Sequence, residues 1–499
     1  MGRLSFLDKN VPEHIAIPIV VYQGYLLFTQ NLTHPMASVA PHSQCLIETL
    51  PYDVLRGIFI HYVSAFLPPR NDNRAAKNAP ITLSHVCSSW RNVTETTPIL
   101  WRHLSYTFIL LDEGAESGVH RFVILKRDLD FIRWWKEKQG AIHPFITARV
   151  SIPRQSTVSR DEFADHGAFE FILDYLMSAQ YLDISSVFWD QIGDRKCPNL
   201  HTLLLCGKVH PLDITFVKTQ AAISVSPSPQ RRLYLSNGVF AQDSVIPSQP
   251  LSSLTHIVLE KVEIPLTIFY DLYQATPGLQ WAYFDISPTE RRHRNETKLT
   301  LTQLNTLIII STCRAEYFFH NLHLPALETL SISSAVYDTW QEVTAILQIQ
   351  WITRATPNLT TLALGERFVS LDTENEIFYL LAVPQFTDVQ PIWINAPRLS
   401  HIQLDTPFFR SETTEPTSDK RIVRFFGRLA RPLRNKWLGL DNSDCPIRTV
   451  TVVSPELEKV QDIALSVFRE QDIRFDLEFS KISVAEEAWH AFNAWGSSF

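Results

Sequence analysis

The sequence contains few of the residues that build phosphate-binding loops, metal centres or disulfide frameworks. Only 15 glycines occur in 499 residues, which argues against the glycine-rich loops that hold nucleotides. The six cysteines are scattered without a CxxC pair, so neither a zinc site nor a disulfide scaffold is indicated. A formal net charge of -7 and the lack of a long basic block disfavour nucleic-acid binding. We therefore expect no metal, no cofactor and no nucleic-acid partner.

The sequence also has no long apolar run. Residues 15–28 are apolar but are interrupted by Pro18, Gln23 and Gly24, whereas a membrane span needs about 20 apolar residues. The same segment lacks the clean hydrophobic core and cleavage site of a secretory signal. Isolated cysteines are typical of a reducing compartment. We therefore expect a cytoplasmic or nuclear protein without a membrane partner.

The motifs of common enzyme classes do not occur. The sequence has no GxxxxGK[ST], GxSxG or HExxH pattern. His201, His210, His256 and His401 share no metal-ligand spacing. We expect no catalytic residues, although a hydrolase with a dispersed Ser-His-Asp triad stays open, because the members of a triad need not be close in sequence.

What the sequence does contain is a pair of amphipathic helical segments between Leu50 and Trp101. Residues 46–63 predict a helix, with Pro51 in its first turn and apolar residues repeating at helical spacing. A polar, proline-bounded loop over 67–80 separates it from a second predicted helix. One face of that second helix carries Leu83, Val86, Cys87, Trp90 and Val93, and Pro98-Ile99-Leu100-Trp101 closes the segment.

A repeat of the form L-x-x-L-x-L follows. Its copies begin at Leu200, Leu254, Leu279, Leu304, Leu327, Leu359 and Leu399, with a partial copy at Leu233 and Leu235. The shorter intervals, from 254 to 327, are 23–25 residues and match the roughly 20–29-residue period of leucine-rich repeats. A single short strand cannot bury its apolar face, so stacked parallel strands covered by outer helices are expected.

Further elements are predicted around these repeats. Expected helices are Leu129–Lys138, Phe169–Ala179, Leu266–Ala275, Trp340–Ala355, Glu374–Leu381, Lys420–Leu433, Ser454–Glu470 and Val484–Trp495. Expected strands outside the repeats are Phe145–Ser151 and Arg474–Phe479. The residues between the leucines, such as Thr202, Thr255, Gln280, Asn305, Glu328, Thr360 and Ser400, are expected to carry specificity on the concave face.

The Leu50–Trp101 segment resembles an F-box. It carries Leu50-Pro51, Val54-Leu55, Ile58-Phe59, Leu83, Val86-Cys87, Trp90-Arg91, Pro98 and Leu100-Trp101 in the order of that family's pattern, with Asp53 where the family usually has Glu. The whole layout looks like the large fungal class of F-box proteins with irregular leucine-rich repeats. The resemblance implies an α/β protein: an N-terminal three-helix F-box module followed by an irregular leucine-rich-repeat solenoid, which is a curved parallel sheet with outer helices.

The same resemblance implies a partner and a role. F-box proteins bind a Skp-type adaptor and through it a cullin, so the chain is expected to be the substrate-recognition subunit of an SCF-type ubiquitin ligase, with an unknown target protein held by the repeats. The residues expected to contribute to adaptor binding are Leu50, Pro51, Val54, Leu55, Ile58, Phe59, Val86, Cys87 and Trp90. The alternative is a leucine-rich-repeat interaction scaffold without ligase association.

These patterns divide the chain into four predicted parts. Residues 1–45 form an N-terminal extension of unclear structure, and 46–105 form the F-box-like helical module. Residues 106–440 form the leucine-rich-repeat-like solenoid, and 441–499 form a C-terminal repeat and cap. A cap is expected because the terminal repeats of such arrays are commonly atypical.

Overall fold

The structure is a computed structural model that describes part of the chain. The described residues are 50–65, 79–112, 122–151, 166–185, 197–206, 212–214, 231–240, 253–288, 298–311, 318–319, 321–334, 351–365, 396–405, 423, 425–427, 429, 449–454, 457–470 and 476–487. The chain forms two compact units, Met1–Gly57 and Ile58–Phe499. The predicted domain boundaries near residues 46, 106 and 441 stay predictions.

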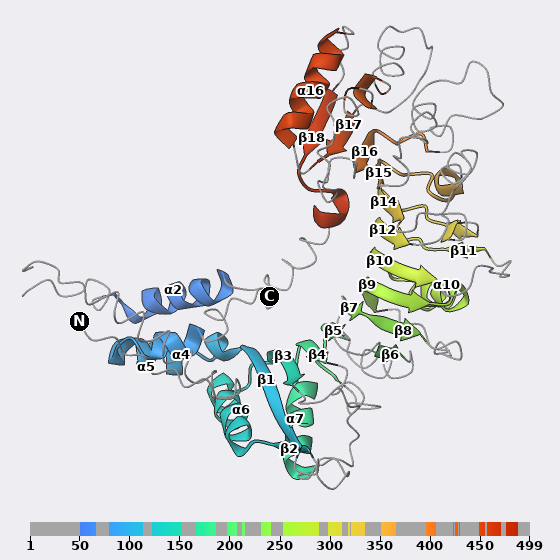
Figure 1. Ribbon diagram of the computed structural model, residues 1–499. Coiled ribbons are helices and arrows are strands. Elements are labelled where there is room, and N and C mark those ends of the chain that lie inside the picture. The colour runs from blue at the N-terminus through green and yellow to red at the C-terminus, as the bar shows by residue number, and fades with distance from the viewer. Residues whose placement is uncertain are drawn as a thin grey trace, which may run out of the picture. The chain divides into compact units, whose positions relative to one another are not determined.

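Helices precede the sheet and connect some of its strands (Figure 1). They include α2 (Tyr52–Ala65), α4 (Ala79–Ser84), α5 (Ser88–Glu95), the 3-10 turn η3 (Pro98–Trp101), α6 (Lys126–Gln139), α7 (His166–Met177), α10 (Leu266–Ala275) and α16 (Leu457–Glu470). Helices α6, α7 and α10 each lie between two strands in sequence, as parallel pairing requires.

The strands follow the helical segment. They are β1 (His103–Asp112), β2 (Phe122–Ile124), β3 (Phe145–Ser151), β4 (Tyr181–Ser185), β5 (Thr202–Cys206), β6 (Leu212–Ile214), β7 (Arg231–Ser236), β8 (Gly238–Phe240), β9 (Leu254–Ile264), β10 (Trp281–Pro288), β11 (Leu299–Thr300), β12 (Thr306–Ser311), β13 (Leu322–His323), β14 (Thr329–Ser334), β15 (Thr361–Leu364), β16 (His401–Asp405), β17 (Thr449–Val453) and β18 (Asp476–Ser480).

Sixteen of the described strands form one sheet, whose main path follows the order of the sequence. The path is β1-β3-β4-β5-β7-β9-β10-β12-β14-β15-β16-β17-β18, and its neighbours pair in parallel. Strand β2 pairs antiparallel with β1 at one edge, and β6 and β8 attach beside β9. The described fold is therefore α/β with a large parallel sheet and several helices, as expected.

The leucines of the repeat stand in register across this sheet. One row runs through Leu203, Leu233, Ile257, Ala282, Leu307, Leu330, Leu362, Ile402 and Val450, and the next through Leu205, Leu235, Leu259, Phe284, Ile309, Ile332, Leu364, Leu404 and Val452. All of these side chains are buried. Because side chains alternate along a strand, both rows lie on one face, which is the core face. The predicted repeat positions are thus confirmed as the main core.

Helix α10 packs on the leucine face. The ring of Phe284 lies 5.1 Å from the ring of Phe269 and 5.7 Å from that of Tyr273, both in edge-to-face geometry. Phe269 also meets Phe318, with ring centroids 5.4 Å apart. Edge-to-face aromatic contacts of this kind add to the burial of the apolar surface itself.

A bulge interrupts the register between β9 and β10. Asp285 pairs with Glu260 and Ile286 pairs with Val262, so Lys261 is the extra residue. Lys261 has φ +54°, a left-handed conformation that a residue with a side chain seldom adopts. Gly365 follows β15 where a Cβ would approach that of Ser333 to 2.5 Å, so the strand end tolerates only glycine there.

Most predicted elements that fall on described residues are present. The predicted helices at 129–138, 169–179, 266–275 and 454–470 appear as α6, α7, α10 and α16, and the predicted strands at 145–151 and 474–479 appear as β3 and β18. Of the predicted helices at 340–355, 420–433 and 484–495, only parts are described: 351–355, 484–487 and a few residues between 423 and 429 are helical. The helix at 374–381, the extension 1–45 and nearly all of the loop 67–80 lie outside the described residues.

The second helix of the N-terminal segment is not one helix. It divides into α4 and α5, separated by His85–Cys87. Cys87 has an extended backbone, with φ -156° and ψ 174°, and forms the N-cap of α5. The single face predicted for Leu83 to Val93 is therefore wrong, because the chain changes direction at Val86 and Cys87.

Candidate functional site

The candidate docking site begins on α2, which has a buried and an exposed apolar stripe. Leu55, Phe59 and Val63 are buried, with 1%, 1% and 6% of their surface exposed. Val54, Ile58 and Tyr62 follow the same four-residue spacing, yet are 46%, 48% and 38% exposed. Residues four apart share one side of a helix. Helix α2 thus presents a continuous apolar stripe that the described fold leaves at the surface.

Pro51 starts this helix in the way that the sequence predicts. Its carbonyl accepts hydrogen bonds from the amides of Val54 and Leu55, both at 3.1 Å. Proline lacks an amide hydrogen, and the first amides of a helix have no partner within the helix, so proline is well suited to this position. Leu50 is partly buried and Pro51 is exposed.

Helix α5 is held by side-chain caps at both ends. The Cys87 sulfur accepts a hydrogen bond from the Trp90 amide at 3.5 Å, which stabilises the first turn. At the other end the hydroxyl of Thr96 donates to the carbonyl of Asn92 at 2.6 Å. The Arg91 side chain donates to the Ser84 carbonyl at 3.1 Å and so links α5 back to α4. Val86, just before the cap, is 52% exposed.

Trp90 joins α5 to α2. Its ring lies 4.8 Å from that of Phe59 in edge-to-face geometry. The buried indole nitrogen Nε1 of Trp90 has no hydrogen-bond partner among the described residues. A buried donor without an acceptor lowers the stability of a fold by about 1–3 kcal/mol. In the described fold the Trp90 indole therefore lacks a hydrogen bond that would stabilise it.

Two tryptophans fix the end of the helical segment to the first part of the sheet. Trp101 Nε1 donates to the Thr94 carbonyl at 2.9 Å, and Trp135 Nε1 of α6 donates to the Trp101 carbonyl at 2.7 Å. The two rings meet edge to face with centroids 5.0 Å apart. Because both indoles are buried and hydrogen-bonded, this junction is rigid, and the helical segment is attached to α6 by more than its covalent link.

The structure divides the expected adaptor-binding residues into three groups by exposure. Pro51, Val54, Ile58 and Val86 are exposed, and Leu50, Cys87 and Trp90 are partly buried. Leu55 and Phe59 are interior residues. The sequence analysis missed Tyr62 and Tyr52, which are also exposed on α2. The four-residue spacing from Val54 through Ile58 to Tyr62 was the signal that could have identified Tyr62.

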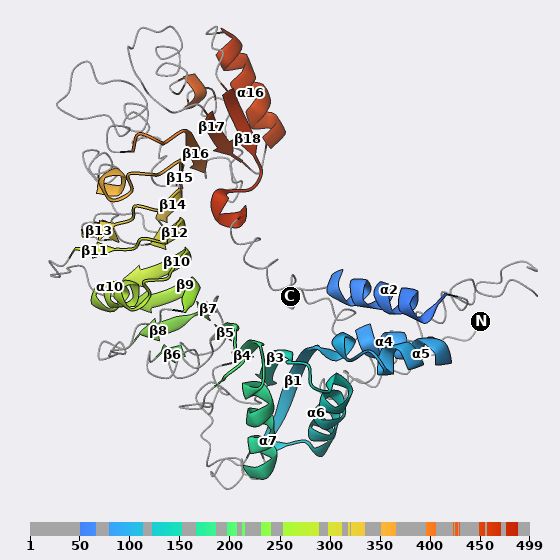
Figure 2. The same cartoon turned by 180° about the vertical axis from the view of Figure 1, so that it is seen from behind.

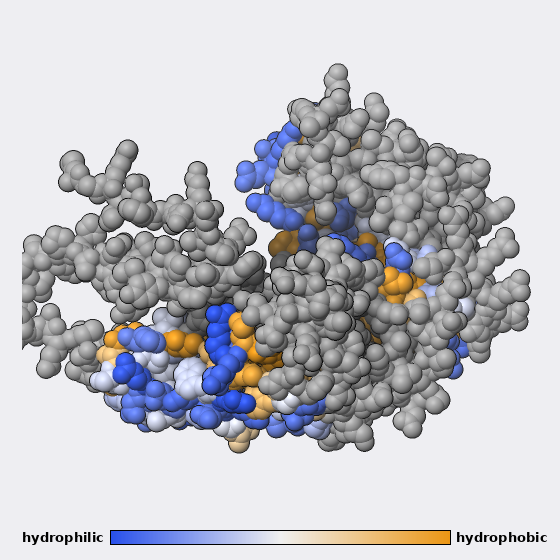
Figure 3. Space-filling view, turned by 60° about the horizontal axis from the view of Figure 1, so that its bottom comes forward, coloured by the Kyte–Doolittle hydropathy of each residue, from blue (hydrophilic) through white to orange (hydrophobic). Residues whose placement is uncertain are grey.

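The exposed fractions of single side chains identify the stripe on α2 better than a view of the surface does. In the space-filling view hydrophobic and hydrophilic residues are intermixed on the visible face (Figure 3). Among the described residues the exposed large apolar side chains include Tyr52, Val54, Ile58 and Tyr62 on α2 and Val86 before α5. Their concentration in one short segment makes that segment the candidate docking surface.

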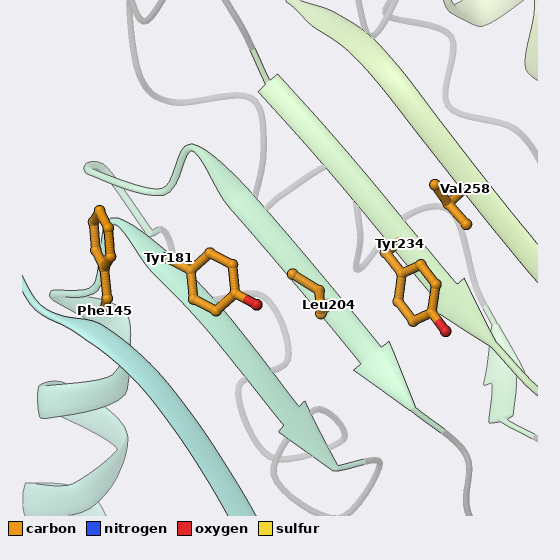
Figure 4. Close-up of a cluster of buried hydrophobic side chains, with 5 residues drawn as sticks. All are labelled: Phe145, Tyr181, Leu204, Tyr234 and Val258. Carbon is orange, nitrogen blue, oxygen red and sulfur yellow. The ribbon is translucent and has the colours of Figure 1, made fainter. Parts of the chain in front are cut away.

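The second candidate surface is the sheet face opposite the leucine rows. Phe145, Tyr181, Leu204, Tyr234 and Val258 form a buried cluster there, and their side chains project from successive strands on one side of the sheet (Figure 4). Trp281 and Tyr283 of β10 pack partly buried against this cluster. The sequence did not show which aromatic residues would lie on this face.

Along the strands this face changes from basic to acidic. Arg232 and His256 stand beside Trp281 at the start of the strands, and the His256 and Trp281 rings stack with centroids 6.1 Å apart. Glu260 and Asp285 stand at the far end, where Glu260 accepts a hydrogen bond from the Tyr234 hydroxyl. A surface with separated charges at the two ends of an aromatic centre can orient a bound segment.

Burial governs the protonation of these groups. Burial, with a further contribution from Arg232, lowers the pKa of His256 to about 4. Burial also lowers the pKa of Arg232 to about 10 and raises the pKa of Asp285 above its ordinary value, to which the neighbouring Glu260 carboxylate adds. At neutral pH His256 is therefore uncharged.

Thr202 and Thr255, two of the residues expected to carry specificity, lie within β5 and β9, and the other five lie slightly off this face. Gln280, Asn305, Glu328, Thr360 and Ser400 precede their strands, and each amide donates to the carbonyl of the corresponding residue one repeat earlier at 2.9–3.0 Å. They therefore form a main-chain ladder at the strand starts. The face itself is built from residues further along the strands, such as His256, Trp281 and His401.

The described histidines bond to other polar side chains. The side chains of His201, His256 and His401 hydrogen-bond with Gln180, Thr255 and Thr451, and none of these bonds joins a serine or cysteine to a histidine. Among the described residues no group of three or more histidine, cysteine, aspartate or glutamate side chains could hold a metal ion. None of the described helices is long and apolar enough to span a bilayer.

Comparison with known proteins supplies no family. No protein-family model matches the chain, and no curated protein matches it. The F-box resemblance therefore stays a prediction that rests on the motif residues.

Proposed function

We propose that the chain is the substrate-recognition subunit of an SCF-type cullin ubiquitin ligase. Its helical segment would bind a Skp-type adaptor, and its sheet would hold a target protein. The exposed apolar stripe Val54, Ile58 and Tyr62 on α2 carries the proposal. Apolar side chains aligned on one helix and left about half exposed are typical of a surface that a partner covers.

The proposal gives different roles to the exposed and the buried motif residues. The exposed side chains of Pro51, Val54, Ile58 and Val86 contact the adaptor. Leu55 and Phe59 act from the interior by holding α2 in place, and Trp90 supports α2 through its contact with Phe59. Leu50 and Cys87 lie between these groups: each is partly buried, and Cys87 also caps α5.

The sheet supports the second half of the proposal. We infer an irregular leucine-rich-repeat solenoid from strands that pair in parallel in the order of the sequence and from two leucine rows that stay in register. Each strand then contacts only its neighbours, as in repeat arrays. On the face opposite the leucines, partly exposed residues such as His256, Trp281 and Tyr283 would take part in recognition. The receptor performs no bond chemistry: it raises the effective concentration of target lysines near the ubiquitin-carrying enzyme.

Copurification with a Skp-type adaptor tests the proposal. The wild-type chain should recover the adaptor, and the double substitution Leu50→Ala, Pro51→Ala should abolish recovery while the thermal unfolding of the sheet is unchanged. A folded wild-type chain that recovers no adaptor would reject ligase association. That result would favour the alternative, an interaction scaffold that uses the sheet face alone.

A further inference from the structure

The last three strands of the sheet carry a hydrogen-bond relay that joins His401 to Glu478 through Thr451. Strands β16, β17 and β18 lie side by side at one end of the sheet (Figures 1 and 2). Nε2 of His401 on β16 lies 2.8 Å from the Thr451 hydroxyl oxygen on β17, which lies 3.1 Å from Oε2 of Glu478 on β18. Because side chains alternate along a strand, all three project from the face opposite the leucine rows.

The relay fixes which nitrogen of His401 carries the proton. A carboxylate only accepts hydrogen bonds, so the one hydroxyl hydrogen of Thr451 goes to Glu478. The Thr451 oxygen is then the acceptor for His401, and Nε2 must donate. Burial lowers the pKa of His401 below its ordinary value of 6.5, although Glu478 and Glu487 oppose this, so the ring is uncharged at neutral pH. An uncharged ring with its proton on Nε2 has a lone pair on Nδ1.

This lone pair is open to a ligand. His401 is partly exposed, and no hydrogen bond of the described fold engages its Nδ1. Nor is Nδ1 among the buried polar atoms that lack a partner in the described fold, so it meets solvent. The neighbours of His401 in the same row are Thr361 and Thr449, whose side chains are shorter than the imidazole. Thr451, in contrast, is only 5% exposed, so the relay behind the ring is sheltered from water.

His256 on β9 provides an internal comparison. The Thr255 hydroxyl donates to the Arg231 carbonyl at 3.1 Å and lies 2.8 Å from Nδ1 of His256. The same reasoning therefore places the proton of uncharged His256 on Nδ1. The two histidines hold opposite tautomers, and of the two it is His401 whose relay ends on a carboxylate.

The charges near His401 favour a cationic ligand. Strands β14 to β18 contain no lysine or arginine, and residues 476–487 hold four acidic residues and one lysine. Five strands lie between β16 and β7, which carries Arg232, and this separation corresponds to about 29 Å at about 4.8 Å per strand. Charges more than about 10 Å apart are largely screened at the surface, so Arg232 does not repel a cation at His401.

A primary ammonium group matches this arrangement. It has three donors and no acceptor, so it binds lone pairs and carboxylate oxygens. His401 offers the lone pair of Nδ1. Glu478 is exposed and offers a negative charge together with Oε1, the oxygen that Thr451 does not engage. An anionic ligand would instead be repelled by Glu478.

We propose that His401 and Glu478 form a recognition site for a lysine side chain of the target protein, with Thr451 as the positioning residue between them. This inference rests on the proposed function, in which the sheet holds the target. The lysine ammonium donates to Nδ1 of His401 and is attracted by the Glu478 carboxylate. The relay keeps the proton of His401 on Nε2, so Nδ1 stays an acceptor at neutral pH.

Nitrogen NMR of the full chain with isotope-labelled histidine tests the tautomer. In an uncharged imidazole the nitrogen without a proton resonates far downfield of the protonated one, so the two tautomers are distinguished. The His401 signals, assigned by their loss in His401→Gln, should show the proton on Nε2, and those of His256 should show it on Nδ1. A proton on Nδ1 of His401 at neutral pH would overturn the proposal.

Three variants test the positioning role of Thr451. Thr451→Val removes the relay and should leave His401 as a mixture of tautomers, whereas Thr451→Ser keeps a hydroxyl and should keep the proton on Nε2. Thr361→Val, on the other side of His401, is the matched control and should change nothing. A tautomer that Thr451→Val leaves unchanged, in a chain with an unchanged melting temperature, would contradict the relay.

Titration of the full chain with two capped pentapeptides tests the ligand. The peptide acetyl-Gly-Gly-Lys-Gly-Gly-amide should shift the Nδ1 signal of His401 in a saturable way, and the same peptide with norleucine, which lacks the ammonium, should not. Glu478→Gln should weaken binding of the lysine peptide at least about threefold, whereas Asp130→Asn on the exposed side of α6 should not change it. Adaptor copurification does not involve His401, so a failed lysine site and a failed ligase assignment give separate results. Equal shifts with both peptides, or no shift with the lysine peptide in a folded chain, would overturn the proposal.

Discussion

The helical segment and the sheet use apolar residues in opposite ways. In the sheet, Leu307 and Leu330 are completely buried in a row that continues from strand to strand. On α2, Val54 and Ile58 are 46% and 48% exposed although they belong to an equally regular pattern. The sheet satisfies its apolar pattern internally, while the helix carries more apolar surface than its own fold buries.

This difference separates stability from recognition. Each repeat strand obtains its neighbours from the same chain, so the leucine pattern describes a core. An exposed apolar stripe on a helix buries little of its apolar surface in the internal fold, and under the proposed function a partner covers it. We therefore expect substitutions in the sheet to change the free energy of unfolding, and substitutions on the exposed stripe to change binding.

The largest effect is expected from Phe284→Ala on the core face. Phe284 is fully buried and meets Phe269 and Tyr273 of α10, so its removal leaves a cavity and should lower the free energy of unfolding by about 3–5 kcal/mol. Chemical denaturation measures this change. A loss below about 1 kcal/mol would mean that the sheet and α10 do not form one core.

A smaller effect is expected at the junction between the two regions. Trp135→Phe removes the donor to the buried Trp101 carbonyl, and an unsatisfied buried acceptor should reduce stability by about 1–3 kcal/mol. The matched control is Trp134→Phe, since Trp134 is 37% exposed, and it should change stability by less than about 0.5 kcal/mol. Equal effects of the two substitutions in denaturation would contradict a rigid junction.

The pH dependence of stability tests the buried face of the sheet. Burial lowers the pKa of His256 to about 4, from an ordinary value of 6.5. Between these values the unfolded chain binds a proton that the folded chain does not, so the free energy of unfolding should fall as the pH drops from 6.5 to 4. Denaturation of His256→Gln at several pH values should show a shallower fall. An identical pH profile would place His256 in solvent.

The smallest effect is expected at the break between α4 and α5. Cys87→Ser replaces a weak sulfur acceptor by a hydroxyl, which is a preferred N-cap, and should stabilise the fold by about 0.5 kcal/mol. The measurement is the shift of the unfolding midpoint. Destabilisation would show that the Cys87 side chain matters for packing more than for its hydrogen bond to the Trp90 amide.

The core of the sheet could be predicted from the sequence because its information is local and repeated. The L-x-x-L-x-L pattern places leucines on one side of every strand, whatever the surroundings. Helix α10 was predicted with the bounds that the structure gives, because an apolar run between proline and a turn leaves few alternatives.

The rest depends on contacts that the sequence pattern does not contain. The break at Cys87 arises from its extended backbone and its cap on α5, and a continuous helical period concealed it. The aromatic cluster from Phe145 to Val258 combines one residue from each of several strands, so no local sequence pattern predicts it. On α2 the sequence identified apolar positions but could not decide which of them are buried.

The affinity of the full-length chain for a purified Skp-type adaptor tests the central claim most directly. Ile58→Glu places a charge in the exposed stripe and should weaken binding at least about 100-fold. Arg56→Glu, on the far side of α2, is the matched control and should change binding by less than about threefold. Both variants should unfold like the wild type. Wild-type binding followed by loss only in Ile58→Glu supports the account, whereas equal binding by both variants, or no binding by the folded wild type, contradicts it.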